Sequence, residues 1–339
     1  GYNMTIVDIA KESGYSVTTV SRVLNDRKDV SPEARKKIME IVEAHGFVPN
    51  NNAKRLKQNI SKNILVLVKG TSNMLFASII EDIQSVIDET GYTVTVTYLD
   101  EDDNIGREAI RLCRERKPLG VLFLGGGRQD FGESIDKFEI PCVLVTTGAD
   151  GWDMKNLSSV AIDDEAASEC AVDYLIENGH RNIAEVGGNL EMSETSISRH
   201  KGYVNSLERH GIKWDERYYE KARFSFDSAY EAMTRLLEKD IPITAVFAIS
   251  DVMAIGAIRA IRDKGLSVPE DISITGFDGT TLADYYNPKI VSIRQQHKEL
   301  ATRSVELLFN MIDLNKVATH EIIPFELTKG ESVKKLTEL

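Results

Sequence analysis

The feature that most constrains the fold of this chain is a regular alternation of apolar runs and helix-like segments that begins at Asn63. Continuous apolar strands joined by helical crossovers predict parallel sheets that are covered by helices on both faces. The expected strands are 64–68, 92–98, 120–124, 142–145, 160–162, 182–186, 245–249 and 272–276. The expected helices are 76–90, 105–116, 166–179, 199–210, 227–238, 251–264 and 297–314.

So many strand–helix repeats predict two Rossmann-like lobes. Ligands of such folds bind outside the carboxyl ends of the strands, so two facing lobes would enclose a small molecule between them. The chain has 339 residues, of which 42% are hydrophobic, and this is enough for two to three domains with cores of their own.

Residues 5–25 predict two short helices in series. Thr5 and Asp8 have the spacing of a capping box, and Gly14 can take the left-handed conformation that ends a helix. Ser16 is the expected N-cap of the second helix. The apolar positions, spaced three and four residues apart, are Ile6, Ile9, Ala10, Val20, Val23 and Leu24.

The opposite face of the second helix carries small, mostly polar side chains and one arginine. It carries Val17, Thr18, Ser21, Arg22 and Asn25. Such a helix suits a DNA major groove, where arginine bonds a guanine edge, methyl groups meet thymine methyls and hydroxyls bond phosphates. The alternative from this pattern alone is a helical hairpin whose polar face is merely solvated.

A third helix is expected to begin after Ser31, with Pro32 at its first position, and to end at Gly46. The three helices would close a small bundle over residues 4–47. The next segment, 49–61, begins with a proline that ends the third helix and continues with a short, basic helix that is unstable alone. Its cations and its single leucine are Lys54, Arg55, Lys57 and Leu56.

The charge is unevenly distributed along the chain. Ten basic and seven acidic side chains give residues 1–60 a charge of +3, and the net charge of −12 then leaves −15 for the remainder. A mildly basic head on an acidic body is typical of a DNA-binding protein with a separate sensing domain.

Composition argues against several other classes. No apolar run approaches the ~20 residues of a membrane span, and the polar amino end does not resemble a signal peptide. Cys113, Cys142 and Cys170 are scattered, which argues against a disulfide framework or a zinc site and for a reducing compartment. We therefore expect a cytoplasmic protein with no metal, no cofactor and no membrane partner.

No motif for catalysis is present in the sequence. The glycines at 125–127 follow a strand but lack the Lys-Ser/Thr ending of a phosphate loop and the spacing of a dinucleotide site, so we expect a flexible turn there. The histidines form no His-Glu-x-x-His pattern, and no serine sits in a nucleophile elbow. We expect no catalytic residues; an enzyme or a solute receptor built on the same two lobes is the alternative.

Several motifs resemble the LacI/GalR family of bacterial transcription regulators. They are Asp8-Ile9-Ala10, Thr19-Val20-Ser21-Arg22-Val23-Leu24-Asn25, Gly179-His180-Arg181-Asn182-Ile183-Ala184, Asp251-Val252-Met253-Ala254-Ile255-Gly256-Ala257 and the stretch from Gly265 to Asp278. The resemblance spans nearly the whole chain. It implies an all-α, lambda-repressor-like helix-turn-helix headpiece (1–48), a hinge helix and linker (49–61) and a periplasmic-binding-protein-like α/β core (62–339). The core would divide into an N-lobe (62–162 plus about 294–325) and a C-lobe (about 163–293).

The same resemblance implies a repressor that binds a pseudo-palindromic, double-stranded operator as a homodimer. Val17, Thr18 and Arg22 would contact bases. The residues expected to position the helix on phosphates are Ser16, Thr19, Ser21 and Asn25. In the hinge, Leu56 would wedge into the minor groove, beside Asn50, Ala53 and Lys54. Lys54 stands where the family usually has arginine, which predicts a weaker contact there.

The family's effector site falls between the lobes. The residues that the resemblance assigns to it are Leu75, Phe76, Thr146, Thr195, Arg199, Phe224, Ser250, Asp278 and Gln295. Arg199 would clamp a polar group of the effector, Phe224 would stack on its face and Asp278 would accept hydrogen bonds from hydroxyls. Core packing is the alternative role for Phe76 and Phe224, and a structural ion pair is the alternative for Arg199 and Asp278.

A carbohydrate is the expected effector. Thr146 and Ser250 stand where the family often has Asp and Asn, and both differences remove partners for sugar hydroxyls. A purine-type corepressor, a sugar phosphate and a catabolite-control type of regulation are therefore the alternatives. The segment from Gly330 to Leu339 carries no heptad repeat that could build a tetramer, so we expect a dimer.

Overall fold

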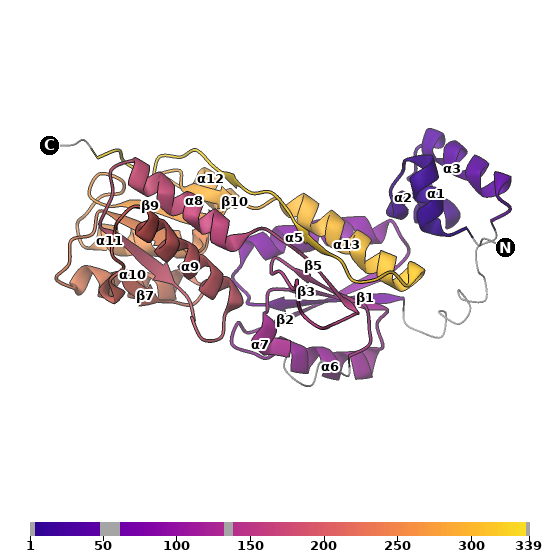
Figure 1. Cartoon of the computed structure of the whole chain (residues 1–339), viewed down its shortest axis with the longest axis horizontal. Helices are drawn as coiled ribbons and strands as arrows, with labels where there is room; N and C mark the ends of the chain where they lie inside the picture. Colours follow the sequence, from indigo (N-terminus) through magenta and orange to yellow (C-terminus); the bar gives the residue numbers. More distant parts are fainter. Residues whose placement is uncertain (1–3, 48–61, 132–137, 337–339) are drawn as a thin grey trace.

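The computed structural model describes residues 4–47, 62–131 and 138–336. Figure 1 shows three bodies in a row: a three-helix headpiece, a first α/β lobe beside it and a second α/β lobe at the far end. The predicted fold class is confirmed, because a helical headpiece is followed by two lobes with largely parallel sheets. Among the helices described, none is both long and apolar enough to span a membrane.

The headpiece consists of α1 (Ile6–Ser13), α2 (Val17–Leu24) and α3 (Pro32–Ala44). The predicted capping box is present: Thr5 N donates to Asp8 Oδ2 at 2.9 Å, and Asp8 N donates to Thr5 Oγ1 at 3.3 Å. These bonds favour the carboxylate and lower the pKa of Asp8. Gly14 ends α1 with φ 77°, and Ser16 Oγ caps α2 by accepting from Thr19 N. Ile9, Val20, Val23, Ile38 and Val42 form the buried centre of the bundle.

The first lobe, the N-lobe, contains a six-stranded parallel sheet in the order β11-β5-β4-β3-β1-β2. Its strands are β1 (Asn63–Lys69), β2 (Thr93–Leu99), β3 (Gly120–Leu124), β4 (Cys142–Val145), β5 (Leu157–Ala161) and β11 (His320–Ile322). The helices of this lobe are α5 (Met74–Asp88), α6 (Ile105–Arg116), α7 (Arg128–Phe131) and α13 (His297–Leu314).

Alternate residues of β1 belong to different hydrophobic clusters, as the two-residue period of a strand requires. Ile64, Val66 and Val68 pack in the cluster that includes α5 and α13, whereas Leu65 and Leu67 pack in the cluster that includes α6. The sheet is therefore covered on both faces, which explains why β1, β3 and β4 are continuous apolar runs.

The second lobe, the C-lobe, contains a six-stranded sheet in the order β12-β10-β9-β8-β6-β7, parallel except for β12. Its strands are β6 (Ile183–Gly187), β7 (Tyr219–Lys221), β8 (Ala245–Ala248), β9 (Ser273–Asp278), β10 (Val291–Arg294) and β12 (Glu326–Leu327). Its helices are α8 (Asp164–Glu177), α9 (Glu194–Arg209), η2 (Glu216–Tyr218), α10 (Phe226–Glu238), α11 (Asp251–Asp263) and α12 (Thr281–Tyr285).

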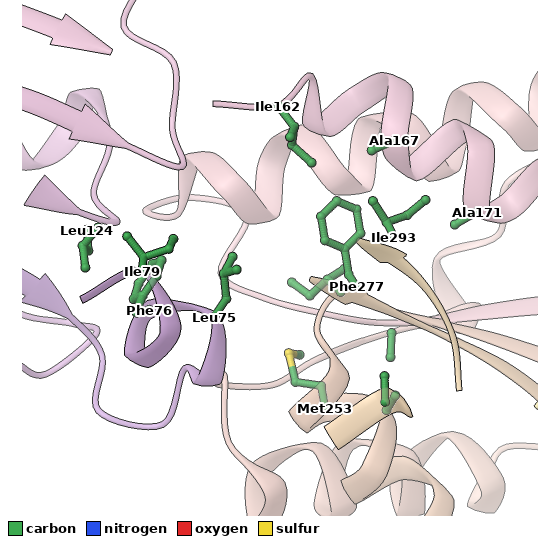
Figure 2. Packing of buried hydrophobic residues seen from close by; sticks show 14 of the residues in the cluster. Leu75, Phe76, Ile79, Leu124, Ile162, Ala167, Ala171, Met253, Phe277 and Ile293 are labelled. Carbon is green, nitrogen blue, oxygen red and sulfur yellow. The ribbon is translucent and has the colours of Figure 1, made fainter. Parts of the chain in front are cut away.

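The chain passes between the two sheets at residues 162–163, 295–296 and 323–325, so the described lobes share three connections. Apolar packing continues up to this junction. Figure 2 shows Phe277 of β9 beside Ile293 of β10 and near Met253 of α11, with Leu75 and Phe76 of α5 on the N-lobe side.

Candidate functional site

The order of the strands reverses between β1 and β3 in the N-lobe and between β6 and β8 in the C-lobe. Such reversals open a crevice at the carboxyl ends of the strands. A cavity of about 460 Å³ lies there, and both lobes line it. This volume falls within the roughly 300–1,000 Å³ of small-molecule sites.

Most of the residues predicted for the effector site line this one cavity. They are Leu75, Phe76, Thr146, Thr195, Arg199, Phe224, Asp278 and Gln295. Ser250 is placed differently: it lies 4% exposed beside a smaller neighbouring pocket, and its Oγ accepts from Met253 N as the N-cap of α11. A capping role therefore accounts for the hydroxyl of Ser250.

Arg199 is held on several sides within the C-lobe. Its Nε donates to Asp164 Oδ1 at 2.9 Å and its Nη1 to the Ile249 carbonyl at 2.5 Å. Its Nη2 lies 3.6 Å from Asp278 Oδ1, and the Arg199 side chain is only 4% exposed. Arg199 and Asp278 therefore form an ion pair and also line the cavity.

Asp278 is buried, and burial raises the pKa of its carboxyl to about 7, against the opposing effect of Arg199. Gln295 Nε2 donates to Asp278 Oδ1 at 2.9 Å. Gln295 is 2% exposed, and its Oε1 has no hydrogen-bond partner within the described ranges. A buried acceptor without a partner is costly, so Gln295 Oε1 suits a ligand hydroxyl.

Two non-glycine residues at the cavity have left-handed backbone conformations. Thr146 follows β4 with φ 76°, and Asp278 ends β9 with φ 100°. Such conformations cost roughly 1–3 kcal/mol and cluster at ligand sites. Gly276 and Phe277 belong to β9, and the bend comes at Asp278 and Gly279.

The aromatic and apolar wall comes from both lobes. Leu75 and Phe76 lie in the first turn of α5, are 3% and 7% exposed, and belong to the hydrophobic cluster as well as to the cavity lining. Phe224 is half-buried, and its backbone N donates to Glu101 Oε1 of the N-lobe at 3.1 Å. These residues therefore pack in the hydrophobic cluster and line the cavity at the same time.

Sequence reasoning missed several cavity residues, above all Lys69 and Asp130. Lys69 Nζ donates to Asp130 Oδ1 at 2.6 Å, and Gly127 N donates to Asp130 Oδ2 at 2.8 Å. Lys69 ends β1, a position that could have signalled it, because the carboxyl end of a strand points into the crevice. Other lining residues that were not predicted include Glu101, Gln129, Asn189, Glu194 and Lys221.

The glycines at 125–127 form a turn after β3, as predicted, with φ 83° at Gly125 and 102° at Gly126. The third glycine serves a close approach between the lobes, because a Cβ on Gly127 would lie 2.6 Å from Glu194 Cβ. Across the described part of the chain, no cluster of His, Cys, Asp or Glu could hold a metal ion.

The residues predicted to contact DNA lie on α2 and at its ends. The hydroxyls of Ser16 (Oγ) and Thr19 (Oγ1) are hydrogen-bonded to each other at 2.9 Å. Asn25 Nδ2 donates to the Ser21 carbonyl at 2.9 Å. Val17 is half-buried, and Thr18, expected on the free face, is only 7% exposed. The predictions for Asn50, Ala53, Lys54 and Leu56 fall outside the described residues.

The face of α2 that was predicted to contact bases is turned toward the N-lobe. Arg22 forms an ion pair with Glu89, and burial lowers the pKa of its guanidinium. Arg27 Nε donates to the Glu89 carbonyl at 2.8 Å, and its Nη2 donates to the Asp88 carbonyl at 2.5 Å. Because α2 also contacts α13, the predicted contacts of Thr18 and Arg22 with DNA require the headpiece to leave this position.

Comparison with known proteins identifies both parts of the chain. Residues 5–50 match the family model described as bacterial regulatory proteins, lacI family, and residues 172–333 match the periplasmic binding protein-like domain. The HTH-type transcriptional regulator MalR of Clostridium butyricum is 39% identical over 336 residues, which is 97% of this chain and 99% of that protein. Catabolite control protein A of Priestia megaterium is 31% identical, over 98% of this chain and all of that protein.

Solved structures agree. The transcriptional regulator CelR–cellobiose complex has a TM-score of 0.72 and 26% identity, and the match covers 97% of this chain and 99% of that one. The lac repressor dimer bound to operator and the anti-inducer ONPF has a TM-score of 0.71 and 26% identity, over 98% of this chain and all of that one. These relatives are regulators and not enzymes, as predicted. The chain belongs to the LacI family of bacterial transcriptional regulators.

Proposed function

We propose that this protein is a repressor that binds a pseudo-palindromic operator as a homodimer and is controlled by a neutral carbohydrate bound between the lobes of its core. The observation that carries the proposal is a cavity of about 460 Å³ lined by both lobes, in a chain that also has a helix-turn-helix headpiece. A ligand that contacts both lobes favours one lobe arrangement over another, and this preference gives it a route to DNA affinity.

In the DNA-bound state, α2 lies in the major groove. Val17, Thr18 and Arg22 contact base edges, while Ser16, Thr19, Ser21 and Asn25 contact phosphates. Residues 49–61 form a hinge in which Leu56 enters the minor groove beside Asn50, Ala53 and Lys54.

The charge of the cavity favours a neutral effector. Its lining contains three basic side chains (Lys69, Arg199 and Lys221) and six acidic ones (Glu101, Asp102, Asp103, Asp130, Glu194 and Asp278). Lys69 and Arg199 are already paired with carboxylates, so neither is available to neutralise a phosphate. The acceptors Asp278 Oδ and Gln295 Oε1 suit donating hydroxyls. A sugar phosphate fits this lining less well than a neutral sugar, and the solved CelR relative is described as a cellobiose complex.

A purine is the second candidate effector, because relatives named PurR repressors are 30–31% identical over nearly the whole chain. Phe76 and Phe224 supply the aromatic faces that a nucleobase would use. Catabolite control protein A is a comparable relative, so a catabolite-control type of regulation is the remaining alternative.

A homodimer is supported by the surface as well as by the lac repressor relative, which is described as a dimer. β2 is an edge strand, and Tyr98 on it is 54% exposed. Met74 at the start of α5 is 41% exposed. An uncovered sheet edge with exposed large apolar side chains suits a protein interface.

Two measurements test the proposal. A duplex selected from a random pool by the full chain should bind at least about 10³-fold more tightly than random duplex at physiological salt, and equal binding would reject operator recognition. A thermal-shift screen should include cellobiose, maltose, glucose 6-phosphate and hypoxanthine. A ligand present at a hundred times its Kd should add about 2.7 kcal/mol to the free energy of unfolding, and stabilisation by hypoxanthine alone would favour the purine alternative.

A further inference from the structure

Three consecutive acidic residues of the N-lobe surround one arginine of the C-lobe at the mouth of the cavity. Asp100, Glu101 and Asp102 follow β2, and Arg223 follows β7. Arg223 Nη2 donates to Asp100 Oδ1 at 2.7 Å, Nη1 bonds Asp102 Oδ2, and Nε lies 3.7 Å from Glu101 Oε1. A single guanidinium therefore joins the two sheets at their carboxyl ends.

Both partners are held in place before they meet. In the acidic loop, Asp100 N donates to Asp103 Oδ2 and Asp102 N donates to Asp100 Oδ2. On the other side, Arg223 N donates to Ser228 Oγ at 2.8 Å, within the first turn of α10. These bonds restrict the acidic loop and the backbone of Arg223, which lowers the entropic cost of the contact.

Glu101 has a second bond across the junction, and it connects the ion pairs to the cavity. Its Oε1 accepts from the backbone N of Phe224 at 3.1 Å, and both residues line the cavity. Glu101 thereby fixes the position of the aromatic wall of the C-lobe against the N-lobe. The close approach of Gly127 to Glu194 brings the two lobes together at a further point of the cavity lining.

We propose that Arg223 and the acidic residues 100–102 form a latch that holds the lobes closed, and that Glu101 is the positioning residue that sets Phe224 over the effector. This rests on the proposed effector site. Opening the lobes would leave three adjacent carboxylates without their cation, and their mutual repulsion opposes opening. A neutral effector then binds with an affinity that depends on salt, because salt screens the latch and not the ligand.

The first test needs no effector. Amide hydrogen exchange in the full chain should show a protected Phe224 amide, because its partner is Glu101. Arg223→Ala and Glu101→Ala should accelerate that exchange about two- to tenfold after correction for intrinsic rates, whereas Glu101→Gln keeps an acceptor and should retain more protection than Glu101→Ala. Arg217→Ala is the control, since Arg217 pairs with Asp215 of its own lobe. Unchanged exchange in Arg223→Ala overturns the latch.

The second test uses cellobiose as the probe, at 50 and 500 mM NaCl by titration calorimetry. The wild type should bind about two- to fivefold more weakly at high salt, and Arg223→Ala should bind weakly at both salt concentrations. Equal salt dependence in the two proteins overturns the latch. If cellobiose does not bind at all, cellobiose is not the effector, and the exchange measurement still decides the latch.

Discussion

The guanidinium carbon of Arg199 lies 3.6 Å above the centre of the Phe277 ring. The arginine is thus held by an aromatic face, by Asp164 and by the Ile249 carbonyl, and its remaining nitrogen faces Asp278. A cation over a desolvated ring adds to the electrostatic support from the carboxylates. This arrangement fixes a polar group at the cavity wall with little freedom to move.

Arg199→Ala should therefore abolish the effector response and also destabilise the core. Its removal leaves Asp164 and Asp278 buried without their cation, which costs about 3–5 kcal/mol. Urea unfolding of the full chain measures this loss. Arg209→Ala on the same helix is the control, because Arg209 is 51% exposed and pairs with Asp173, so it should cost only about 0–1 kcal/mol. Equal losses in the two variants would show that Arg199 is not the centre of the network.

Asp278 predicts how stability depends on pH. Its pKa in the folded protein is raised to about 7, mainly by burial, from the ordinary value of 3.8. The folded state therefore binds an extra proton between these values, and the stability that this proton provides is lost as pH rises through about 7. Burial also raises the pKa of Asp251, to about 6, which acts in the same direction.

Asp278→Asn cannot ionise, so its free energy of unfolding relative to wild type should rise from pH 5 to about pH 7 and level off above that pH. Calorimetric melting at several pH values measures this difference. Asp215→Asn is the control: the bonds from Arg217 lower the pKa of Asp215, so its contribution changes only in more acidic solution. A difference for Asp278→Asn that does not vary with pH would contradict the assignment.

The architecture could be predicted from the sequence because the central strands are continuous apolar runs. β3 and β4 were predicted residue for residue, and α6 and α13 likewise. β7, β10, β11 and β12 were not predicted. β7 and β11 are polar three-residue strands and β12 has two residues, so none of these three shows a period that a sequence window can detect.

The site was predictable where a residue lies at a recognisable motif, and unpredictable where its role depends on a distant partner. Asp278 ends such a motif, and the family resemblance assigned Arg199 directly. Lys69 and Asp130 are 61 positions apart, and Glu101 and Phe224 are 123 apart. These pairs come together only when the fold places the strand ends side by side. The local sequence pattern therefore cannot predict which residues will pair.

Arg22 provides a test of DNA reading. Arg22→Ala should cost roughly 1–3 kcal/mol of affinity for the selected operator and relax the preference at one base pair, because arginine bonds a guanine edge with two donors. Lys36→Ala on the exposed side of α3 is a charge-matched control. Fluorescence anisotropy with operators substituted at each position measures both effects. An equal loss on operator and random duplex would mean that Arg22 contacts only phosphates.

The contact between Arg22 and Glu89 predicts that the N-lobe and DNA compete for the same face of the headpiece. Arg27 strengthens this contact by donating to the carbonyls of Asp88 and Glu89 at the end of α5, where the helix dipole favours a cation. Operator binding has to break these bonds before Arg22 can reach a base. Glu89→Ala removes the ion pair and leaves every predicted DNA contact in place, so operator affinity should rise about 1.5- to fivefold, the equivalent of a surface ion pair.

Glu115→Ala is the control for the general loss of a negative charge, since Glu115 lies on α6 and is 57% exposed. A gain in Glu89→Ala that exceeds the gain in Glu115→Ala, measured at the same ionic strength, supports the competition. Equal gains would assign the effect to long-range electrostatics, and no gain would show that the headpiece leaves the N-lobe without cost.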